Sequence, residues 1–167
     1  MDKKITEFKE NNTPYSTEFG DIYFSVDDGM AETEHVFLKG NRLPESWNDH
    51  KHIRICETGF GTGLNFFMAA SLFEKTKKKG QKLFYTAIEK NPLKQEDILK
   101  SLEKWRDNFG DVFDIFLSKY PIRISGFHPI IIKPDIILVL IFDDIKDALL
   151  EVNDKQDFWF LDGFAPA

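Results

Sequence analysis

The sequence predicts an α/β protein built on a doubly wound parallel sheet, and three observations support that class. From residue 53 onward, short apolar runs alternate with amphipathic segments of helical length. The run Asp135–Phe142, DIILVLIF, is apolar without interruption, as is typical of a parallel strand covered on both faces. The glycine-rich turn GFGTG, residues 59–63, follows the first apolar run, where a strand would pass into a helix.

The first 50 residues differ in composition from the rest and are predicted to form a lead-in. Residues 1–20 are polar, whereas Asp21–Ser25 and His35–Leu38 have the composition of short strands. We expect these two runs to pair as a small N-terminal β-hairpin. Residues 51–167 are expected to form one domain, because a chain of 167 residues has room for about one.

The pattern of strand, loop and helix repeats through residues 51–167. Strands are expected at Ile53–Cys56, Leu83–Ile88, Asp135–Phe142 and Phe158–Leu161. Helices are expected at Leu64–Lys75, Phe109–Lys119 and Ile145–Val152, and in a segment that begins at Asn91-Pro92 and places Ile98, Leu102 and Trp105 on one face. The stretch Ser125–Pro134, SGFHPIIIKP, is expected to be irregular.

Composition excludes several classes of protein. The single cysteine, Cys56, excludes an internal disulfide framework and a cysteine-based zinc cluster, and no other group has the spacing of metal ligands. No apolar run reaches the roughly 20 residues of a membrane helix. The charged segment Met1–Lys9 lacks the apolar core of a secretory signal. We therefore expect a cytoplasmic protein with no membrane partner and no metal.

The formal net charge of −6 argues against broad electrostatic attraction to nucleic acid. One basic cluster is the exception, formed by Lys75, Lys77, Lys78 and Lys79. Its simpler interpretation is a solvated helix end whose lysines oppose the helix dipole. The alternative is a patch that contacts phosphate.

The three glycines of the turn, Gly59, Gly61 and Gly63, predict a ligand-binding site. Without a Cβ atom the backbone can turn tightly and come close to a ligand, and the strand ends of such sheets form the usual ligand crevice. A sharp turn alone would explain one glycine but not three. The spacing G-x-G-x-G differs from the dinucleotide fingerprint and lacks the Gly-Lys-Ser/Thr ending of a nucleoside triphosphate site.

Acidic residues at the strand ends indicate which ligand is bound. Glu57, two residues before Gly59, would repel a pyrophosphate and attract an ammonium group, which favours S-adenosylmethionine over NAD. Glu89 ends the second strand and can accept hydrogen bonds from both ribose hydroxyls, unless it is a surface glutamate. Asp144, after Asp143, either accepts from the adenine amino group or caps the helix that follows, or does both. Asp162 ends the fourth strand, so each strand carries an acid at its tip.

The motifs ETGFGTGLNFF, YTAIEKNP, FDDIKDAL and FWFLDGFAPA together resemble the methyltransferase domain of the bacterial tRNA 5-methylaminomethyl-2-thiouridine biosynthesis enzymes. FGDIYFSVDDGMAETEHVFLKGNRLPESW and YPIRISGFHPI resemble the same family, so the similarity runs from Pro14 to Ala167. One departure is Asp143-Asp144, where the family usually has Gly-Asp. The resemblance implies a Rossmann-like class I methyltransferase fold, S-adenosylmethionine as cofactor and tRNA as partner.

The resemblance also implies the reaction, which is methylation of the primary amine of 5-aminomethyl-2-thiouridine at the wobble position. In many members this domain is fused to a C-terminal FAD-dependent oxidase, of which these residues show no trace. The family fold has seven strands and only four are expected here. We therefore expect a fragment, truncated after the fourth strand, that leaves Phe158–Leu161 as an exposed edge.

The expected cofactor contacts are Glu57, Gly59, Phe60, Gly61, Gly63, Asn65, Glu89 and Asp144. Asp162 is the expected catalytic residue, positioning the acceptor amine and accepting its hydrogen bond or proton; its alternative role is to form the turn before Gly163. Phe164 and Pro166 are expected to wall a pocket for the target base, although Phe164 fits core packing equally well. His128 is more simply structural than catalytic.

Two other functions remain open at this point. The same scaffold methylates many acceptors, so a small molecule or a protein is an alternative substrate. A non-catalytic domain that binds only a partner or the cofactor is the other alternative.

Overall fold

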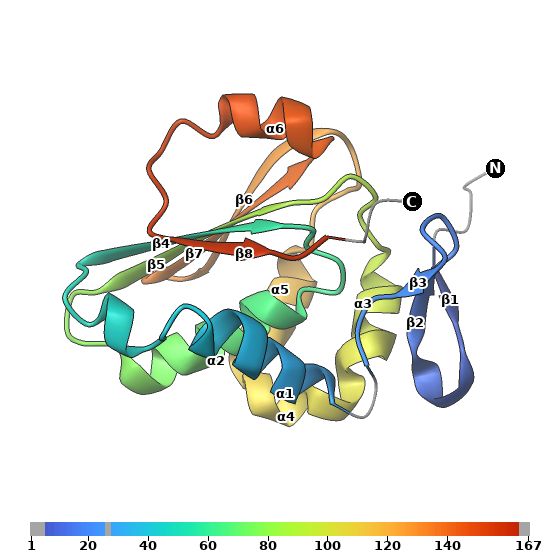
Figure 1. The fold of residues 1–167 in the computed structure, drawn as a ribbon, viewed down its shortest axis with the longest axis horizontal. Coiled ribbons are helices and arrows are strands. Elements are labelled where there is room, and N and C mark those ends of the chain that lie inside the picture. Colours follow the sequence, from blue (N-terminus) through green and yellow to red (C-terminus); the bar gives the residue numbers. More distant parts are fainter. Residues whose placement is uncertain (1–5, 26–27, 164–167) are drawn as a thin grey trace.

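The computed structural model describes residues 6–25 and 28–163, and its centre is a five-stranded sheet with the order β6-β7-β5-β4-β8 (Figure 1). Four strands are parallel: β4 (His52–Thr58), β5 (Lys82–Ile88), β7 (Ile136–Phe142) and β8 (Phe158–Leu161). The fifth, β6 (Gly126–Lys133), is antiparallel to β7. All four strands expected from the sequence are therefore confirmed.

The strand order reverses once, between β4 and β8. From β4 the chain adds β5 and then β7 on one side, and it returns to place β8 on the other side of β4. Helix α2 (Leu64–Thr76) follows β4 and covers one face of the sheet, whereas α6 (Ile145–Glu151) precedes β8 and covers the opposite face (Figure 1). Such a reversal separates the loops at the carboxyl ends of two neighbouring strands and opens a crevice there.

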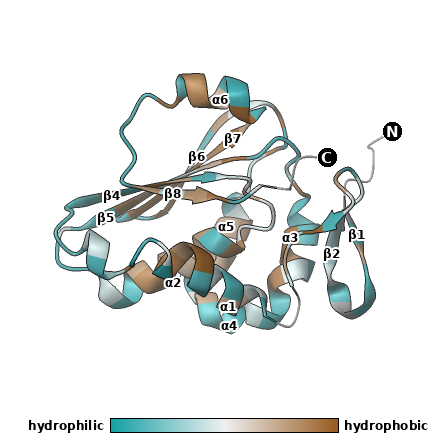
Figure 2. Ribbon diagram, in the orientation of Figure 1, coloured by the Kyte–Doolittle hydropathy of each residue, from teal (hydrophilic) through white to brown (hydrophobic). Residues whose placement is uncertain are grey.

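The larger core lies between the sheet and α2, together with α4 (Arg106–Phe109) and α5 (Asp111–Lys119). The ring of Phe67 in α2 lies 5.1 to 5.2 Å, between centroids, from the rings of Phe109, Phe113 and Phe116. Figure 2 shows the apolar colour concentrated on α2 and on the strands. The face under α6 carries a smaller core of Cys56, Ile88, Ile141 and Ala148.

The N-terminal segment contains a small β layer, as expected, but other residues form it. The layer consists of β1 (Thr6–Phe8), β2 (Pro14–Ser16) and β3 (Asp21–Ile22), all antiparallel. The prediction that His35–Leu38 is a strand is wrong, because this run lies in the helical turns η2 (Glu34–Lys39) that continue α1 (Gly29–Thr33). The side chains that face the core here have the spacing of a helix: Thr33 and Leu38 are buried, and Met30 and Phe37 are half-buried. The four residues His35–Leu38 alone are too few to show this spacing.

The rest of the lead-in packs on the main core. The lead-in also contains two short helical turns, η1 (Glu10–Asn12) and η3 (Glu45–Trp47). Trp47 is fully buried, and the centroid of its ring lies 6.2 Å from that of Phe73 in α2. The division into residues 1–50 and 51–167 stays a prediction.

Two further expectations for residues 91–134 are wrong. Ser125–Pro134 is mostly the strand β6 rather than irregular, since Pro129 is tolerated on an edge strand, where one side of the backbone needs no partner. Helix α3 (Gln95–Leu102) begins at Gln95 and not at Asn91. The backbone N–H of Asn91 donates a hydrogen bond to the Glu89 carboxylate at 2.8 Å.

The remaining helices differ from the expectation only in their bounds. The expected helix Phe109–Lys119 is α5, which begins at Asp111, and Gly110, at φ +58°, separates it from α4, which ends at Phe109. Ile98 and Leu102 are buried as expected, and Trp105, in the turn η4 (Glu103–Trp105), is half-buried beside Phe24 at 5.3 Å between ring centroids. Within the described ranges, none of the helices has the length and apolar character needed to traverse a bilayer.

Candidate functional site

A cavity of about 630 Å³ lies at the carboxyl edge of the sheet, beside the reversal between β4 and β8. The glycine turn forms one wall, and residues from the N-terminal segment form the opposite wall. The structure brings the predicted strand-end acids together here: Glu89, Asp143, Asp144 and Asp162 all line the cavity. The edge that the sequence predicted as a binding site is therefore hollow and acidic.

The three glycines of the turn are required for different reasons. A Cβ atom on Gly59 (φ +93°) would lie 2.0 Å from the carbonyl oxygen of Asp162, so this glycine allows β4 and β8 to approach. Gly63 (φ +85°) begins α2, and a Cβ there would lie 2.6 Å from the Phe60 ring. The Tyr23 ring packs closely against Gly61 (φ +53°), and a Cβ there would lie 3.1 Å from it. Gly59 and Gly61 line the cavity and Gly63 lies behind it.

Glu89 follows β5 and holds the turn. Its Oε2 accepts from the N–H of Gly61 and its Oε1 from the N–H of Asn91, both at 2.8 Å. Burial raises the pKa of this carboxyl, while the two backbone N–H groups lower it. A carboxylate has about four lone-pair sites, so two remain for a ligand in the cavity.

Glu57 lies beneath the cavity floor, only 1% exposed. Its Oε2 accepts from the Tyr85 hydroxyl at 2.9 Å and its Oε1 from Asn65 at 2.7 Å. Burial raises its pKa well above the usual range, and the nearby Asp162 charge raises it further. Glu57 is not part of the cavity lining, so it acts on the site through Asn65, which lines the cavity and donates to it.

Asp162 follows β8 and lies on the rim, half-buried. Its Oδ2 accepts from Asn65 Nδ2 at 2.7 Å. Burial raises its pKa, the Asn65 hydrogen bond lowers it, and the charge of Glu32 raises it. A carboxylate with a raised pKa is a stronger proton acceptor than an ordinary aspartate, which suits a general base.

Asp144 caps the N-terminus of α6, which is one of the two roles that the sequence predicted for it. Its Oδ1 accepts from the N–H of Lys146 at 3.0 Å, and its Oδ2 lies 3.1 Å from Lys90 Nζ. These two groups lower its pKa. Asp144 also lines the cavity, and Phe60 lines it from the turn while its ring packs 5.8 Å from that of Phe116.

The sequence did not indicate the wall contributed by the N-terminal segment. Tyr23, Phe24, Glu32, Thr33 and Phe37 all line the cavity. They lie in the stretch FGDIYFSVDDGMAETEHVFLKGNRLPESW, which resembles the family but for which the sequence predicted no role at the site. The helical spacing after residue 28 is the other signal that could have indicated part of this wall. Phe164 and Pro166, expected to wall a base pocket, lie outside the described residues.

His128 lies away from the cavity, on β6. Its Nε2 is 2.8 Å from the carbonyl oxygen of Ile124, and its ring packs 4.7 Å from that of Phe142. This placement agrees with a structural role. No group of three or more metal-ligating side chains is found in the part of the chain that the structure describes.

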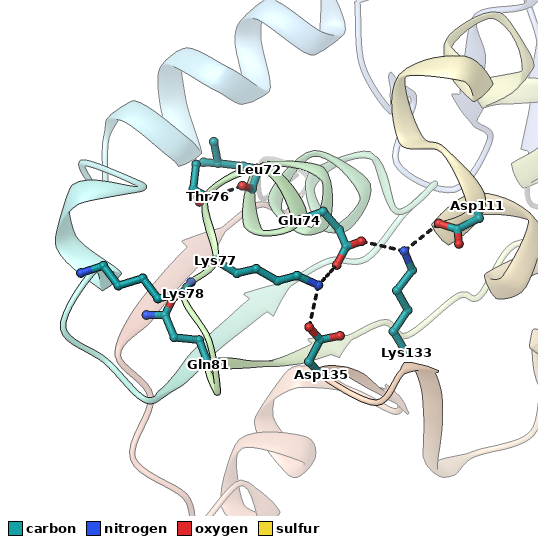
Figure 3. Close-up of polar contacts among 9 residues, drawn as sticks. All are labelled: Leu72, Glu74, Thr76, Lys77, Lys78, Gln81, Asp111, Lys133 and Asp135. Carbon is teal, nitrogen blue, oxygen red and sulfur yellow. Dashed lines mark hydrogen bonds and ion pairs between the residues drawn. The ribbon is translucent and has the colours of Figure 1, made fainter.

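The basic cluster after α2 lies at the opposite, amino-terminal edge of the sheet. Figure 3 shows Lys77 between Glu74 and Asp135, with Nζ–O distances of 2.5 and 2.6 Å, and Lys133 between Glu74 and Asp111 at 2.6 and 2.8 Å. Lys78 Nζ donates to the carbonyl oxygen of Asn48 at 2.9 Å. These contacts support the interpretation of the cluster as a helix end, since two of its lysines tie α2 to neighbouring loops.

Comparison with known proteins gives a consistent result. Residues 107–167 match a family model described as S-adenosyl-L-methionine-dependent methyltransferase. The chain is 38% identical over 160 residues to the tRNA 5-methylaminomethyl-2-thiouridine biosynthesis bifunctional protein MnmC of Chromohalobacter salexigens, covering 94% of this chain and 23% of that protein. The protein of the same name from Campylobacter concisus is 41% identical over 158 residues, covering 92% and 24%.

A solved structure shares the fold. The crystal structure of MNMC2 from Aquifex aeolicus matches with a TM-score of 0.69 at 24% identity, covering 96% of this chain and 49% of that one. The chain thus spans about a quarter of the length of the curated relatives it matches and about half of that structure.

Proposed function

Because the chain belongs to the S-adenosyl-L-methionine-dependent methyltransferases, we propose that the cavity binds S-adenosyl-L-methionine for methylation of tRNA. The acceptor is the 5-aminomethyl group of wobble 5-aminomethyl-2-thiouridine, and the product is 5-methylaminomethyl-2-thiouridine. The observation that carries the proposal is the hydrogen bond between Gly61 and Glu89 at the edge of a hollow, acidic cavity. The names of relatives that align with over 90% of the chain support the acceptor.

The cavity suits this cofactor better than a dinucleotide. Carboxylates of Glu32, Glu89, Asp143, Asp144 and Asp162 surround it, and the ammonium of Lys90, which also lines it, is paired with Asp144. A pyrophosphate would meet like charge at this lining, whereas a sulfonium and an ammonium group would be attracted to it.

We assign the cofactor contacts to the two sides of the glycine turn. Glu89 is placed to accept hydrogen bonds from ribose hydroxyls, and Asp144 with Lys90 lies where an adenine amino group would be bound. Gly59, Phe60 and Gly61 form the adjoining wall. Glu57 and Gly63 are outside the lining and support this wall, Glu57 through its hydrogen bond from Asn65 and Gly63 as the residue before α2.

Asp162 is placed for the acceptor. The bound cofactor supplies an activated methyl group on a sulfonium, and the task of the protein is to align a nucleophile with it. An alkyl amine attacks only when it is neutral, and Asp162 is placed to accept its hydrogen bond or proton. Phe37 and Glu32 line the same end of the cavity and would face the acceptor.

The partner in this proposal is the anticodon region of tRNA, and the compartment is the cytoplasm. The relatives are named as bifunctional proteins, and the chain spans about a quarter of each. We propose that the second activity, an FAD-dependent oxidase in this family by resemblance, belongs to residues outside this chain.

Nucleoside analysis of tRNA from a strain lacking the gene tests the acceptor. We expect 5-aminomethyl-2-thiouridine to accumulate at the wobble position and the methylated form to be lost. Unchanged wobble uridine would exclude the tRNA assignment. Titration calorimetry with S-adenosyl-L-methionine then separates a methyltransferase with another acceptor, which would bind the cofactor, from a domain that binds none.

A further inference from the structure

The side chain of Asn65 is polar and only 4% exposed, and it lies between two carboxylates. Its Nδ2 donates to Glu57 Oε1 and to Asp162 Oδ2, both at 2.7 Å. Its Oδ1 accepts from the hydroxyl of Thr33 at 2.9 Å. Both amide hydrogens and one carbonyl lone pair are therefore used within the protein.

Only an amide fits these three partners. Two carboxylates need donors, and the Thr33 hydroxyl donates to an acceptor on the opposite side of the group. An aspartate at position 65 would have no hydrogen for either acid, and an apolar residue would leave both acids without this donor. The two acids fix which way the amide is turned, because the flipped amide would place its carbonyl oxygen against them. In this orientation the Thr33 hydroxyl, which can donate or accept, donates to Oδ1 and holds the amide in place.

Acidic groups act on one another at this site. Beyond the effect of burial, the charge of Glu32, from α1, raises the pKa of Asp162. The charge of Asp162 raises the pKa of Glu57 in β4 and of Glu89 after β5 in the same way. The ammonium of Lys90, which lines the same cavity, is paired with Asp144. The neutral hydroxyl of Tyr85 lies behind Glu57. Asn65 is thus the donor that opposes this repulsion, and it also fixes where the Asp162 carboxylate points.

We propose that Asn65 is a positioning residue, whose amide holds the Asp162 carboxylate toward the acceptor end of the cavity and is itself held in place by Thr33. The proposal rests on the proposed function, in which Asp162 receives the acceptor proton. It makes helix α1 part of the catalytic arrangement, because Thr33 is the last residue of α1.

The test compares Thr33→Val, which removes the hydroxyl at nearly constant shape, with Thr33→Ser, which keeps it. Asn65→Ala and Asp162→Asn complete the set, and Ser71→Ala is the control on α2, since the Ser71 hydroxyl bonds only the carbonyl of Asn108 at 3.3 Å. The whole protein, as its gene encodes it, is assayed for methyl transfer to hypomodified tRNA as a function of pH. Calorimetry gives the dissociation constant of S-adenosyl-L-methionine for each variant.

We expect kcat to fall roughly 10²-fold in Asn65→Ala, as for a misplaced catalytic group, and about tenfold in Thr33→Val, for one lost hydrogen bond. In both variants the acid limb of the rate profile moves to higher pH, because the ionised form of Asp162 is no longer stabilised by a well-placed hydrogen bond from Asn65. Thr33→Ser and Ser71→Ala keep the profile of the parent protein. The cofactor dissociation constant changes little throughout.

Three outcomes would overturn the inference. The first is an acid limb that stays in place in Thr33→Val. The second is an equal loss of rate in Thr33→Ser, which would indicate packing rather than the hydroxyl. The third is a rise in the cofactor dissociation constant of Asn65→Ala that accounts for its loss of rate, which would make Asn65 a cofactor ligand. Full activity of Asp162→Asn would instead contradict the proposed function itself.

Discussion

The backbone N–H of Gly61 donates to the carboxylate of Glu89, with 2.8 Å between the nitrogen and Oε2. This bond joins the turn after β4 to the end of β5, so the two parts of the predicted cofactor site hold each other in place. The second oxygen of Glu89 bonds Asn91 on the other side. The wall of the cavity is therefore organised before any ligand arrives.

Replacing Gly61 with valine should abolish cofactor binding and leave the sheet folded. The new Cβ would lie 3.1 Å from the Tyr23 ring, so the turn and this ring, which both line the cavity, would have to move apart and change its shape. Gly80→Val is the control, because Gly80 also has a positive φ, +85° against +53° for Gly61, and has no atom within 4 Å of an added Cβ. Both variants carry the strain of a side chain at positive φ. Calorimetry that gives equal cofactor affinity for Gly61→Val and the parent protein would contradict the placement of the site.

Replacing Glu89 with alanine should raise the cofactor dissociation constant, by about 10- to 100-fold, because charge-assisted hydrogen bonds contribute roughly 1.5–3 kcal/mol. Asp162→Ala should behave in the opposite way, with turnover reduced about 10²–10⁴-fold and cofactor affinity nearly kept. Parallel calorimetry and single-turnover assays on the two variants check this contrast. Equal losses of affinity and rate in Asp162→Ala would make Asp162 a cofactor ligand.

Replacing Glu57 with glutamine should change how stability depends on pH. The folded state raises the pKa of Glu57 above its unfolded value, so the folded protein takes up this proton more readily and the contribution of Glu57 to stability falls as pH rises. The parent protein should therefore gain stability relative to Glu57→Gln as the pH is lowered from about 8 to about 5.5. Thermal unfolding of both proteins across this range measures the difference, and identical slopes would show that Glu57 does not titrate there.

A polypeptide of these 167 residues should associate through the β8 edge. Among the described residues β8 pairs only with β4, and two of its own apolar side chains are exposed, Trp159 at 41% and Leu161 at 74%. An unpaired edge beside apolar side chains is a template for pairing with another chain. Sedimentation velocity over a range of concentrations should show association that Leu161→Lys reduces.

Leu150→Lys is the control for this prediction, because Leu150 is 78% exposed on α6 and lies away from the edge. It should leave the association nearly unchanged. A polypeptide that stays monomeric at every concentration would contradict the role of the edge.

The sequence predicted the part of the fold in which local patterns and tertiary structure agree. Ile53–Cys56 and Asp135–Phe142 are apolar because both faces of the sheet are covered near them, and this burial is visible in the residues themselves. The prediction failed for β6 because Pro129 argues against a strand unless the strand is known to be at an edge. It also failed at His35–Leu38, where four apolar or aromatic residues fit either period.

The same limit applies to the site. The strand-end acids could be predicted, because parallel strands bring their carboxyl ends to one edge. The contacts of Asn65 could not, since its partners Glu57, Thr33 and Asp162 lie 8, 32 and 97 residues away. A side chain with partners so far apart has no signature in local spacing, and only the folded arrangement shows why an amide is needed.

The close approach of Gly59 to Asp162 has a consequence for how the protein is synthesised. The strand that carries Gly59 leaves the ribosome early, and its partner β8 emerges about 100 residues later, at the end of a long crossover. Pairings between such distant segments form slowly, because the closure of the intervening loop precedes any gain from the contact. β4 can join β5 and β7 as they emerge, but its other edge waits for β8. The side of the cavity that carries Asp162 is thus formed later than the glycine turn, and the nascent chain brings the two together only when β8 has been added to β4.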